Sequence, residues 1–178
     1  MDDDTGRLVY RAGFVDARTA GRWFDDLLAG VTWRSERRRM YDRDVDVPRR
    51  VAGFRLGEGD VPPPIAEAAR RARETMGAPF NSAGINLYRD GADSVAPHND
   101  RLYEIVAGFP IALISLGATR LMTIRSKAAP RRSFDLDLEP GSLLEMSYET
   151  QLHYDHAIPK TRAAVGPRIT LALRVRPA

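Results

Sequence analysis

Two short segments of the sequence contain side chains that commonly bind metal ions. His98 and Asp100 are separated by one residue in "VAPHNDRLY", and the other two histidines, His153 and His156, stand in "QLHYDHAIPK". On an extended segment, residues two apart project to the same side, so His98 and Asp100 can reach one ion. Taken alone, such a pair is more typical of a hydrogen-bonded surface loop. A metal site needs a third ligand, for which His156 is our first choice and His153 the alternative.

Two imidazoles and one carboxylate suit a metal that must keep open positions. When they occupy one face of an octahedron, three adjacent positions stay free, which is how non-haem Fe(II) oxygenases bind a co-substrate and O₂. Zinc accepts the same ligand types and is the alternative metal. The sequence has no cysteine, which excludes thiolate metal sites and disulfides.

The last strand-like segment, "PRITLALRV", alternates strictly between two faces. Ile169, Leu171, Leu173 and Val175 share one face, and Arg168, Thr170, Ala172 and Arg174 share the other. If the apolar face lies in the packed layer between two sheets, the arginines point into a barrel mouth or into water. An arginine in a cavity offers a planar fork for a carboxylate, which suits a dicarboxylate such as 2-oxoglutarate.

The N-terminal part of the chain predicts two helices. After a short strand at 8–10, Asp16 can cap a helix that ends near Gly30, and "VPPPIAEAARRARETMG" predicts a second helix closed by Gly77. The apolar faces of these helices consist of Ala20, Trp23, Phe24, Leu27 and Leu28, and of Ile65, Ala69, Ala72 and Met76. Residues 34–60 are expected to form loops with one hairpin around 51–56.

Short β-like runs separated by turn residues follow from Phe80 onward. We expect strands at 82–88, 111–116, 120–125, 133–139, 143–148 and 168–175. Two helices followed by six or more strands predict an α+β fold in which the helices pack on one face of a β-sandwich.

The composition suits one ordinary globular domain. The chain has 178 residues, 43% of them hydrophobic, with no apolar run near the roughly 18 residues that cross a bilayer. The N-terminus "MDDDTGRLVY" lacks the layout of a signal peptide, so we expect a cytoplasmic monomer without a membrane partner. The formal net charge is +3, and residues 34–57 carry eight arginines against four acidic residues, a local excess of four. This cluster suits a polyanionic partner without requiring one.

Four segments together resemble the AlkB family of Fe(II)- and 2-oxoglutarate-dependent dioxygenases: "FNSAGINLYRDGADSVAPHND", "PIALISLGATRLMTIR", "PGSLLEMSYETQLHYDHAIPK" and "GPRITLALR". The resemblance covers residues 78–177 well and the N-terminal part loosely. It implies a double-stranded β-helix (jelly-roll) core over 78–178, with two supporting helices and a substrate lid within 1–77. It also implies iron held by His98, Asp100 and His156, and 2-oxoglutarate bound by Asn86, Tyr88, Arg168 and Arg174.

The resemblance further implies a reaction class. Members of the family use O₂ and 2-oxoglutarate to hydroxylate a C–H bond, typically the methyl group on an alkylated base nitrogen, and release succinate and formaldehyde. The expected partner is therefore alkylated DNA or RNA. The first alternative is a dioxygenase with the same machinery acting on a small molecule or a protein side chain. The second is a β-barrel binding module that has lost its metal.

Some residues depart from the family pattern. Leu102 replaces an acidic residue that contacts the damaged base, Thr170 replaces an asparagine, and Tyr154 replaces a tryptophan. The lid corresponds to the arginine-rich segment 34–55, in which Tyr41 would stack on a base and Arg49 would contact a phosphate. A leucine cannot accept a hydrogen bond from an exocyclic amine, so the base preference of this chain is open.

Overall fold

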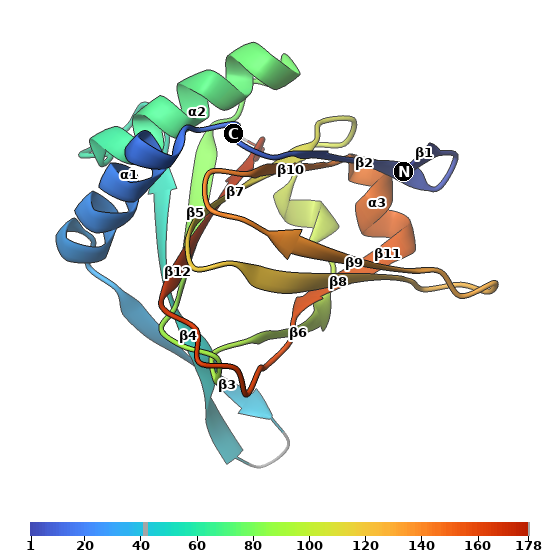
Figure 1. The fold of residues 1–178 in the computed structure, drawn as a ribbon. Helices are drawn as coiled ribbons and strands as arrows, with labels where there is room; N and C mark the ends of the chain where they lie inside the picture. Colours follow the sequence, from blue (N-terminus) through green and yellow to red (C-terminus); the bar gives the residue numbers. More distant parts are fainter. Residues whose placement is uncertain (41–42, 178) are drawn as a thin grey trace.

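The computed structural model describes residues 1–40 and 43–177 (Figure 1). In this part of the chain, no helix has the length and apolar character that a membrane span requires. The elements in chain order are β1 (Asp2–Asp3), β2 (Gly6–Arg11), α1 (Ala17–Gly30), β3 (Arg34–Met40), β4 (Arg43–Arg55), α2 (Pro63–Met76), β5 (Ser82–Tyr88), β6 (Val95–His98), the 3₁₀ helix η1 (Leu102–Glu104), β7 (Ile111–Gly117), β8 (Arg120–Ser126), β9 (Ser133–Leu138), β10 (Leu143–Met146), α3 (Tyr148–His153), β11 (Tyr154–Ile158) and β12 (Arg168–Arg174).

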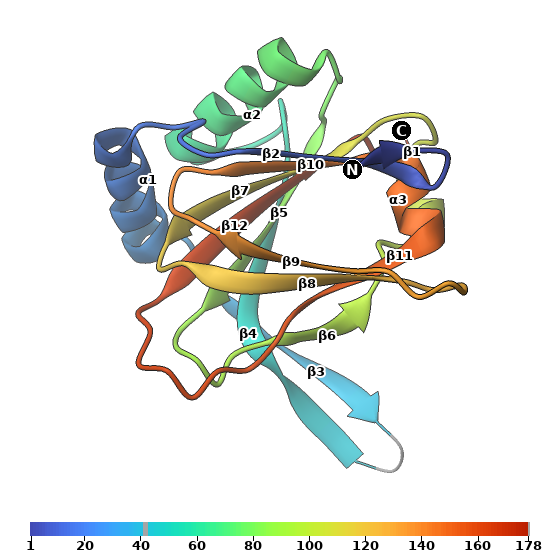
Figure 2. The same ribbon diagram turned by 45° about the vertical axis from the view of Figure 1, so that its right-hand side comes forward.

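The strands form two antiparallel sheets that face each other. The larger sheet has the order β1-β2-β10-β7-β12-β5-β4-β3, and the smaller has the order β6-β11-β8-β9. Figure 2 shows the small sheet lying across one face of the large one, while α1 and α2 lie over the opposite face. The α+β fold with a jelly-roll core and two supporting helices is therefore confirmed.

The two helices begin and end where the sequence predicts. The Asp16 side chain accepts a hydrogen bond from the Thr19 amide and caps α1, and Gly77 ends α2 in the left-handed conformation (φ 64°). Trp23, Leu27 and Ile65 are buried against the large sheet. Leu28 is an exception, because 37% of it is exposed and it does not belong to the packing face.

Strand β12 lies at the centre of the large sheet, paired with β7 on one side and β5 on the other. Its apolar residues pack in one cluster with side chains of α1 and α2. This apolar face therefore does not lie between the two sheets, because the helices cover it. The opposite face, which carries Arg168 and Arg174, points to the interior between the sheets.

Several elements were not predicted from the sequence. Residues 34–55 form a hairpin of two long strands, β3 and β4, that extends beyond the sheet (Figure 1), where loops and a short hairpin were expected. The strand expected to continue to Tyr148 ends at Met146, and α3 follows it. Strands β6 and β11 also escaped prediction. The hairpin sequence is so polar that apolar and polar residues do not alternate along it, so it gives no strand signal. The segments of β6, α3 and β11 are only four to six residues long.

Gly117 allows three parts of the fold to approach each other beside Arg168. It pairs with Arg168 in the β7–β12 ladder, has φ +81°, and a Cβ there would lie 2.5 Å from the Pro167 carbonyl oxygen and 2.6 Å from the Phe24 ring. Gly13 has a similar φ, +63°, but a Cβ there would meet nothing within 4 Å.

We therefore expect Gly117→Ala to lower the free energy of unfolding more than Gly13→Ala. Gly13→Ala carries only the conformational cost of about 1–2 kcal/mol. In Gly117→Ala the new methyl group must also displace the Pro167 backbone and the Phe24 ring. The free energy of unfolding of this variant should therefore fall by more than about 3 kcal/mol. Urea denaturation of both variants measures the difference, and equal losses would contradict the close approach.

Candidate metal centre and pocket

The small sheet brings two histidines together. In the β6–β11 ladder His98 is the direct partner of His156, and their ring centroids are 4.4 Å apart. Asp100 follows β6, and one ligand atom from each of the three residues lies within 4.8 Å of the other two. His153 lies exposed in α3, away from this cluster. The choice between the two distant histidines thus falls on His156.

Both imidazoles have a lone pair available for a metal. His98 Nδ1 lies 2.9 Å from the Ala96 carbonyl oxygen, so Nδ1–H donates to it and the lone pair of the neutral imidazole is on Nε2. Burial, reinforced by the neighbouring His98, lowers the pKa of His156 from 6.5 to about 3. A neutral imidazole is the form that binds metal ions.

The carboxylate of Asp100 is held by Arg174. Arg174 Nε donates to Oδ2 at 2.5 Å and Nη2 donates to Oδ1 at 3.1 Å. Burial alone would raise the pKa of Asp100, but the Arg174 guanidinium outweighs it and the pKa is lowered. Asp100 is therefore ionised, as a metal ligand must be.

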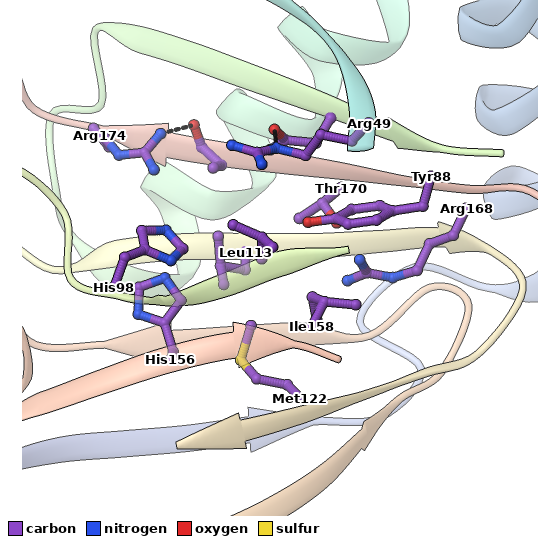
Figure 3. Close-up of a pocket in the computed structure, with 13 residues that line it drawn as sticks. Arg49, Tyr88, His98, Leu113, Met122, His156, Ile158, Arg168, Thr170 and Arg174 are labelled. Atoms are coloured by element: carbon purple, nitrogen blue, oxygen red, sulfur yellow. Dashed lines mark hydrogen bonds between the residues drawn. The ribbon is translucent and has the colours of Figure 1, made fainter. Parts of the chain in front are cut away.

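The cluster opens into a pocket between the two sheets with about 410 Å³ of space not filled by atoms, its open mouth included. In Figure 3 the two imidazoles lie at one end, and Arg168 and Tyr88 lie at the other. The pocket is lined by Arg49, Asn86, Tyr88, Val95, His98, Leu113, Met122, His156, Ile158, Arg168, Thr170, Ala172 and Arg174.

Arg168 is a buried cation with unused hydrogen-bond donors. It is only 1% exposed, and its Nη2 donates to Ser115 Oγ at 2.8 Å. Within the described residues, its Nε and Nη1 and the hydroxyl of Thr170 meet no hydrogen-bond partner. Burial lowers the pKa of Arg168 to about 10, which leaves it protonated at neutral pH. An anionic ligand that accepts from these free donors would offset the cost of burying the charge.

The other residues expected to bind 2-oxoglutarate face the same space. Tyr88 is the direct partner of Arg168 in the β5–β12 ladder, and Asn86 is the partner of Thr170. The Arg168 guanidinium carbon lies 5.3 Å from the Tyr88 ring centroid. Burial raises the pKa of the Tyr88 hydroxyl, so it is a hydrogen-bond donor at neutral pH.

The three residues expected to contact substrate have different positions. Arg49, on β4, lines the pocket and donates from Nε to Asn86 Oδ1 at 2.9 Å. Leu102, in η1, is half-buried against the apolar cluster formed by residues of both sheets and is not among the pocket-lining residues. Tyr41 lies outside the described residues.

Comparison with known proteins agrees with this arrangement. Residues 59–174 match the model of the 2OG-Fe(II) oxygenase superfamily. The chain belongs to the 2OG-Fe(II) oxygenase superfamily. It is 37% identical over 119 residues to the DNA oxidative demethylase ALKBH2 of Mus musculus, covering 62% of this chain and 50% of that protein. It is also 30% identical over 191 residues to alpha-ketoglutarate-dependent dioxygenase alkB homolog 3 of Bos taurus, covering 94% and 65%.

Two solved structures share the fold of this oxygenase. OsALKBH1 superposes with a TM-score of 0.60 at 15% identity and covers 94% of this chain and 97% of its own. A Pseudomonas putida prolyl-4-hydroxylase gives 0.58 at 13% identity, covering 97% and 95%. The resemblance to the AlkB family is confirmed, and this chain spans about half the length of ALKBH2.

The cofactors of the superfamily are Fe(II) and 2-oxoglutarate, and the residues present fit both. Two imidazoles and a carboxylate are the donor set of a facial Fe(II) site. Arg168 is a buried cation with free donors on Nε and Nη1, which suits an anionic group such as a carboxylate. Zinc, the alternative metal, would account for the two histidines and the aspartate but gives no reason for the free donors of Arg168.

Ser115 and Gln151 were missed by the sequence analysis. Ser115 accepts from Arg168, and Gln151, fully buried in α3, accepts from the Asp100 amide at 3.0 Å. In "IALISLG" a serine interrupts an apolar strand, and alternation places it on the same face as Leu113. That signal could have identified Ser115. Gln151 carried no signal, because α3 was not predicted.

We expect Arg168→Met to weaken 2-oxoglutarate binding strongly without unfolding the protein. Losing one partner of a buried charge pair costs about 2–5 kcal/mol, or about thirtyfold or more in Kd. Removal of a cation that lacks a counterion should not lower the melting temperature of the ligand-free protein. Calorimetric titration with 2-oxoglutarate and Mn(II), without oxygen, measures the affinity.

Ser115→Ala is the graded control, because it removes only the hydroxyl that orients Arg168 and should cost up to about tenfold. Unchanged 2-oxoglutarate affinity in Arg168→Met would refute the role of this arginine.

The metal-free protein should lose stability as the pH falls from 6.5 toward 3. In that range His156 takes up a proton in the unfolded chain but not in the folded one, because its folded pKa is about 3. The free energy of unfolding then falls by at most about 1.4 kcal/mol per pH unit from this residue.

His156→Gln should therefore show a shallower decline between pH 6.5 and 4.5, a window above the titration of Asp100. His153→Gln, which changes an exposed imidazole, should follow the wild type. Chemical denaturation across this window gives the slopes, and identical slopes for wild type and His156→Gln would contradict the buried neutral imidazole.

Proposed function

We propose that this oxygenase demethylates alkylated nucleobases in DNA or RNA and releases succinate and formaldehyde. The observation that carries the proposal is the convergence of His98, Asp100 and His156 at one end of a pocket that has the incompletely paired Arg168 at its other end. The relatives named as DNA oxidative demethylases support the substrate class. In this proposal His98, Asp100 and His156 hold iron, while Asn86, Tyr88, Arg168 and Arg174 bind 2-oxoglutarate.

When bound, the iron supplies O₂ activation, coupled to decarboxylation of 2-oxoglutarate to succinate and CO₂. The protein supplies binding and orientation. Arg168 and Tyr88 fix one carboxylate of the co-substrate at the far end of the pocket, so its 2-oxo acid end is directed to the imidazoles. Leu113, Met122 and Ile158 line the pocket with apolar surface and limit water near the reacting atoms.

The substrate would reach this site from the side of the β3–β4 hairpin. Arg49, on β4, is the guanidinium that links the hairpin to the pocket. The hairpin sequence has Arg37, Arg38 and Arg39 in a row, a charge pattern that suits a phosphate backbone. A target base must leave its stack to enter a pocket of this kind, so single strands should react more readily than duplexes.

A second candidate is a hydroxylase or demethylase of a small molecule or a protein side chain with the same cofactors. Leu102 favours it, because this position offers no acceptor for an exocyclic amine and its side chain packs against the core. Both candidates require succinate formation, and only the first requires a nucleic acid.

The test is formaldehyde and succinate release from oligonucleotides methylated on a ring nitrogen of adenine or cytosine, with Fe(II), 2-oxoglutarate and O₂. We expect stoichiometric release from the wild type and none from His98→Ala. Succinate formation without formaldehyde from any oligonucleotide would refute the nucleic-acid proposal and favour the second candidate.

Charge reversal sharpens this test. Arg38→Glu with Arg39→Glu should raise the KM for a methylated oligonucleotide but not for the corresponding methylated nucleoside. Arg18→Glu with Arg22→Glu makes the same charge change on the exposed face of α1, across the large sheet from the pocket, and should leave both KM values near those of the wild type.

A further inference from the structure

The backbone that carries Asp100 lies beyond the last residue pair of its β ladder. The β6–β11 pairing ends at His98 and His156, so Asn99 and Asp100 are not held by any of the described strands. Other contacts fix them. The Asp100 amide donates to Gln151 Oε1 at 3.0 Å, and the Asp100 carbonyl accepts from Asn99 Nδ2 at 2.7 Å. Both peptide groups of this residue are thus held by side chains.

Lys127 closes these contacts into a ring. Its ammonium donates to Asn99 Oδ1 at 2.9 Å and to the Gln151 carbonyl at 2.8 Å, and the carboxylate of Asp155 lies 3.8 Å away. The ring therefore links the segment after β6, the helix α3 and the turn after β8. In Figure 2, α3 runs directly into β11, the strand that carries His156. The ring fixes one metal ligand relative to the element that supplies another.

The residue type at this position fits the geometry. Only two of the 27 basic residues in the chain are lysines, Lys127 and Lys160. An ammonium is compact and has three donors that can point to three acceptors in different directions, whereas a guanidinium donates in one plane. Two oxygens, on Asn99 and Gln151, accept hydrogen bonds from Lys127, and a third, on Asp155, lies at ion-pair distance.

We propose that Lys127, acting through Asn99 and Gln151, is a positioning residue for the metal ligand Asp100. The inference rests on the proposed iron site and deepens it. Lys127 touches neither the ligand atoms nor the pocket. It holds the main chain of residues 99–100, while Arg174 holds the Asp100 side chain, so that the carboxylate meets the ion together with the two imidazoles. Contacts of this kind around a metal site are worth about 10–100-fold in metal affinity.

The test is anaerobic binding of Co(II), whose visible absorption reports the ligand geometry, to the full chain without 2-oxoglutarate. Lys127→Met keeps the aliphatic stem and removes the donors. We expect Co(II) affinity to fall by about 10–100-fold with an altered visible spectrum. Lys160→Met is the matched control, because Lys160 is exposed, and it should bind Co(II) as the wild type does.

Two further variants separate positioning from other effects. Lys127→Arg keeps the positive charge but not the three divergent donors, so its Co(II) affinity should stay below that of the wild type. A Co(II) affinity equal to that of the wild type would show that charge alone suffices and would overturn the proposal. Asn99→Ala should weaken binding as Lys127→Met does, and the double variant should lose little more, because both act through one ring. The melting temperature of metal-free Lys127→Met should stay near that of the wild type, whereas a purely structural role would lower it and spare the affinity.

The wild type and His98→Ala are measured first. If the wild type binds no Co(II), or His98→Ala binds it equally well, the metal centre itself is refuted, and the role of Lys127 falls with it. If His98 is required but Lys127→Met binds as the wild type does, only the positioning role is refuted.

Discussion

The buried guanidinium of Arg168 is the constraint on which the pocket depends. Burial of a charge away from water is costly unless a counterion is near, yet among residues 1–40 and 43–177 Arg168 contacts only the Ser115 hydroxyl and the Tyr88 ring as polar or aromatic partners. The fold enforces this position through the other face of β12. Its apolar side chains are anchored under α1 and α2, so alternation directs Arg168 inward. Hydrophobic packing on one face thus supports an unbalanced charge on the other.

The metal centre depends on both sheets. The small sheet aligns the two imidazoles through a single pair of residues, and the large sheet supplies Arg174, which binds the carboxylate of Asp100. That ion pair joins the segment after β6 to β12 of the large sheet. The contacts of Lys127 and Gln151 fix the same residue from the outside. Asp100 is therefore restrained by both its backbone and its side chain before any ion binds.

How much of this the sequence predicts depends on whether local pattern or tertiary contact decides each element. The helices and β12 follow from capping residues and strict alternation, and the pairing of arginines on one face was read correctly. Whether that face points into a cavity or into water was left open, because alternation does not say which layer covers each side. Strands β6 and β11 are short and owe their form to each other, so no window of sequence shows them. The three candidate metal ligands were chosen from residue type and family resemblance, whereas the contacts of Gln151 and Lys127 exist only in the folded chain.

The charges of the site also link its two cofactors. Arg49, Arg168 and Arg174 contribute three positive charges and Asp100 one negative charge, a sum of +2 with both imidazoles neutral. Fe(II) alone would raise the sum to +4, while dianionic 2-oxoglutarate alone would reduce it to zero. Binding of both returns it to +2. Because opposite charges attract strongly in a pocket screened from water, each cofactor should increase the affinity for the other, and this coupling must be equal in both directions. The three pocket arginines thus disfavour a bare metal ion, and an anionic co-substrate would offset this effect.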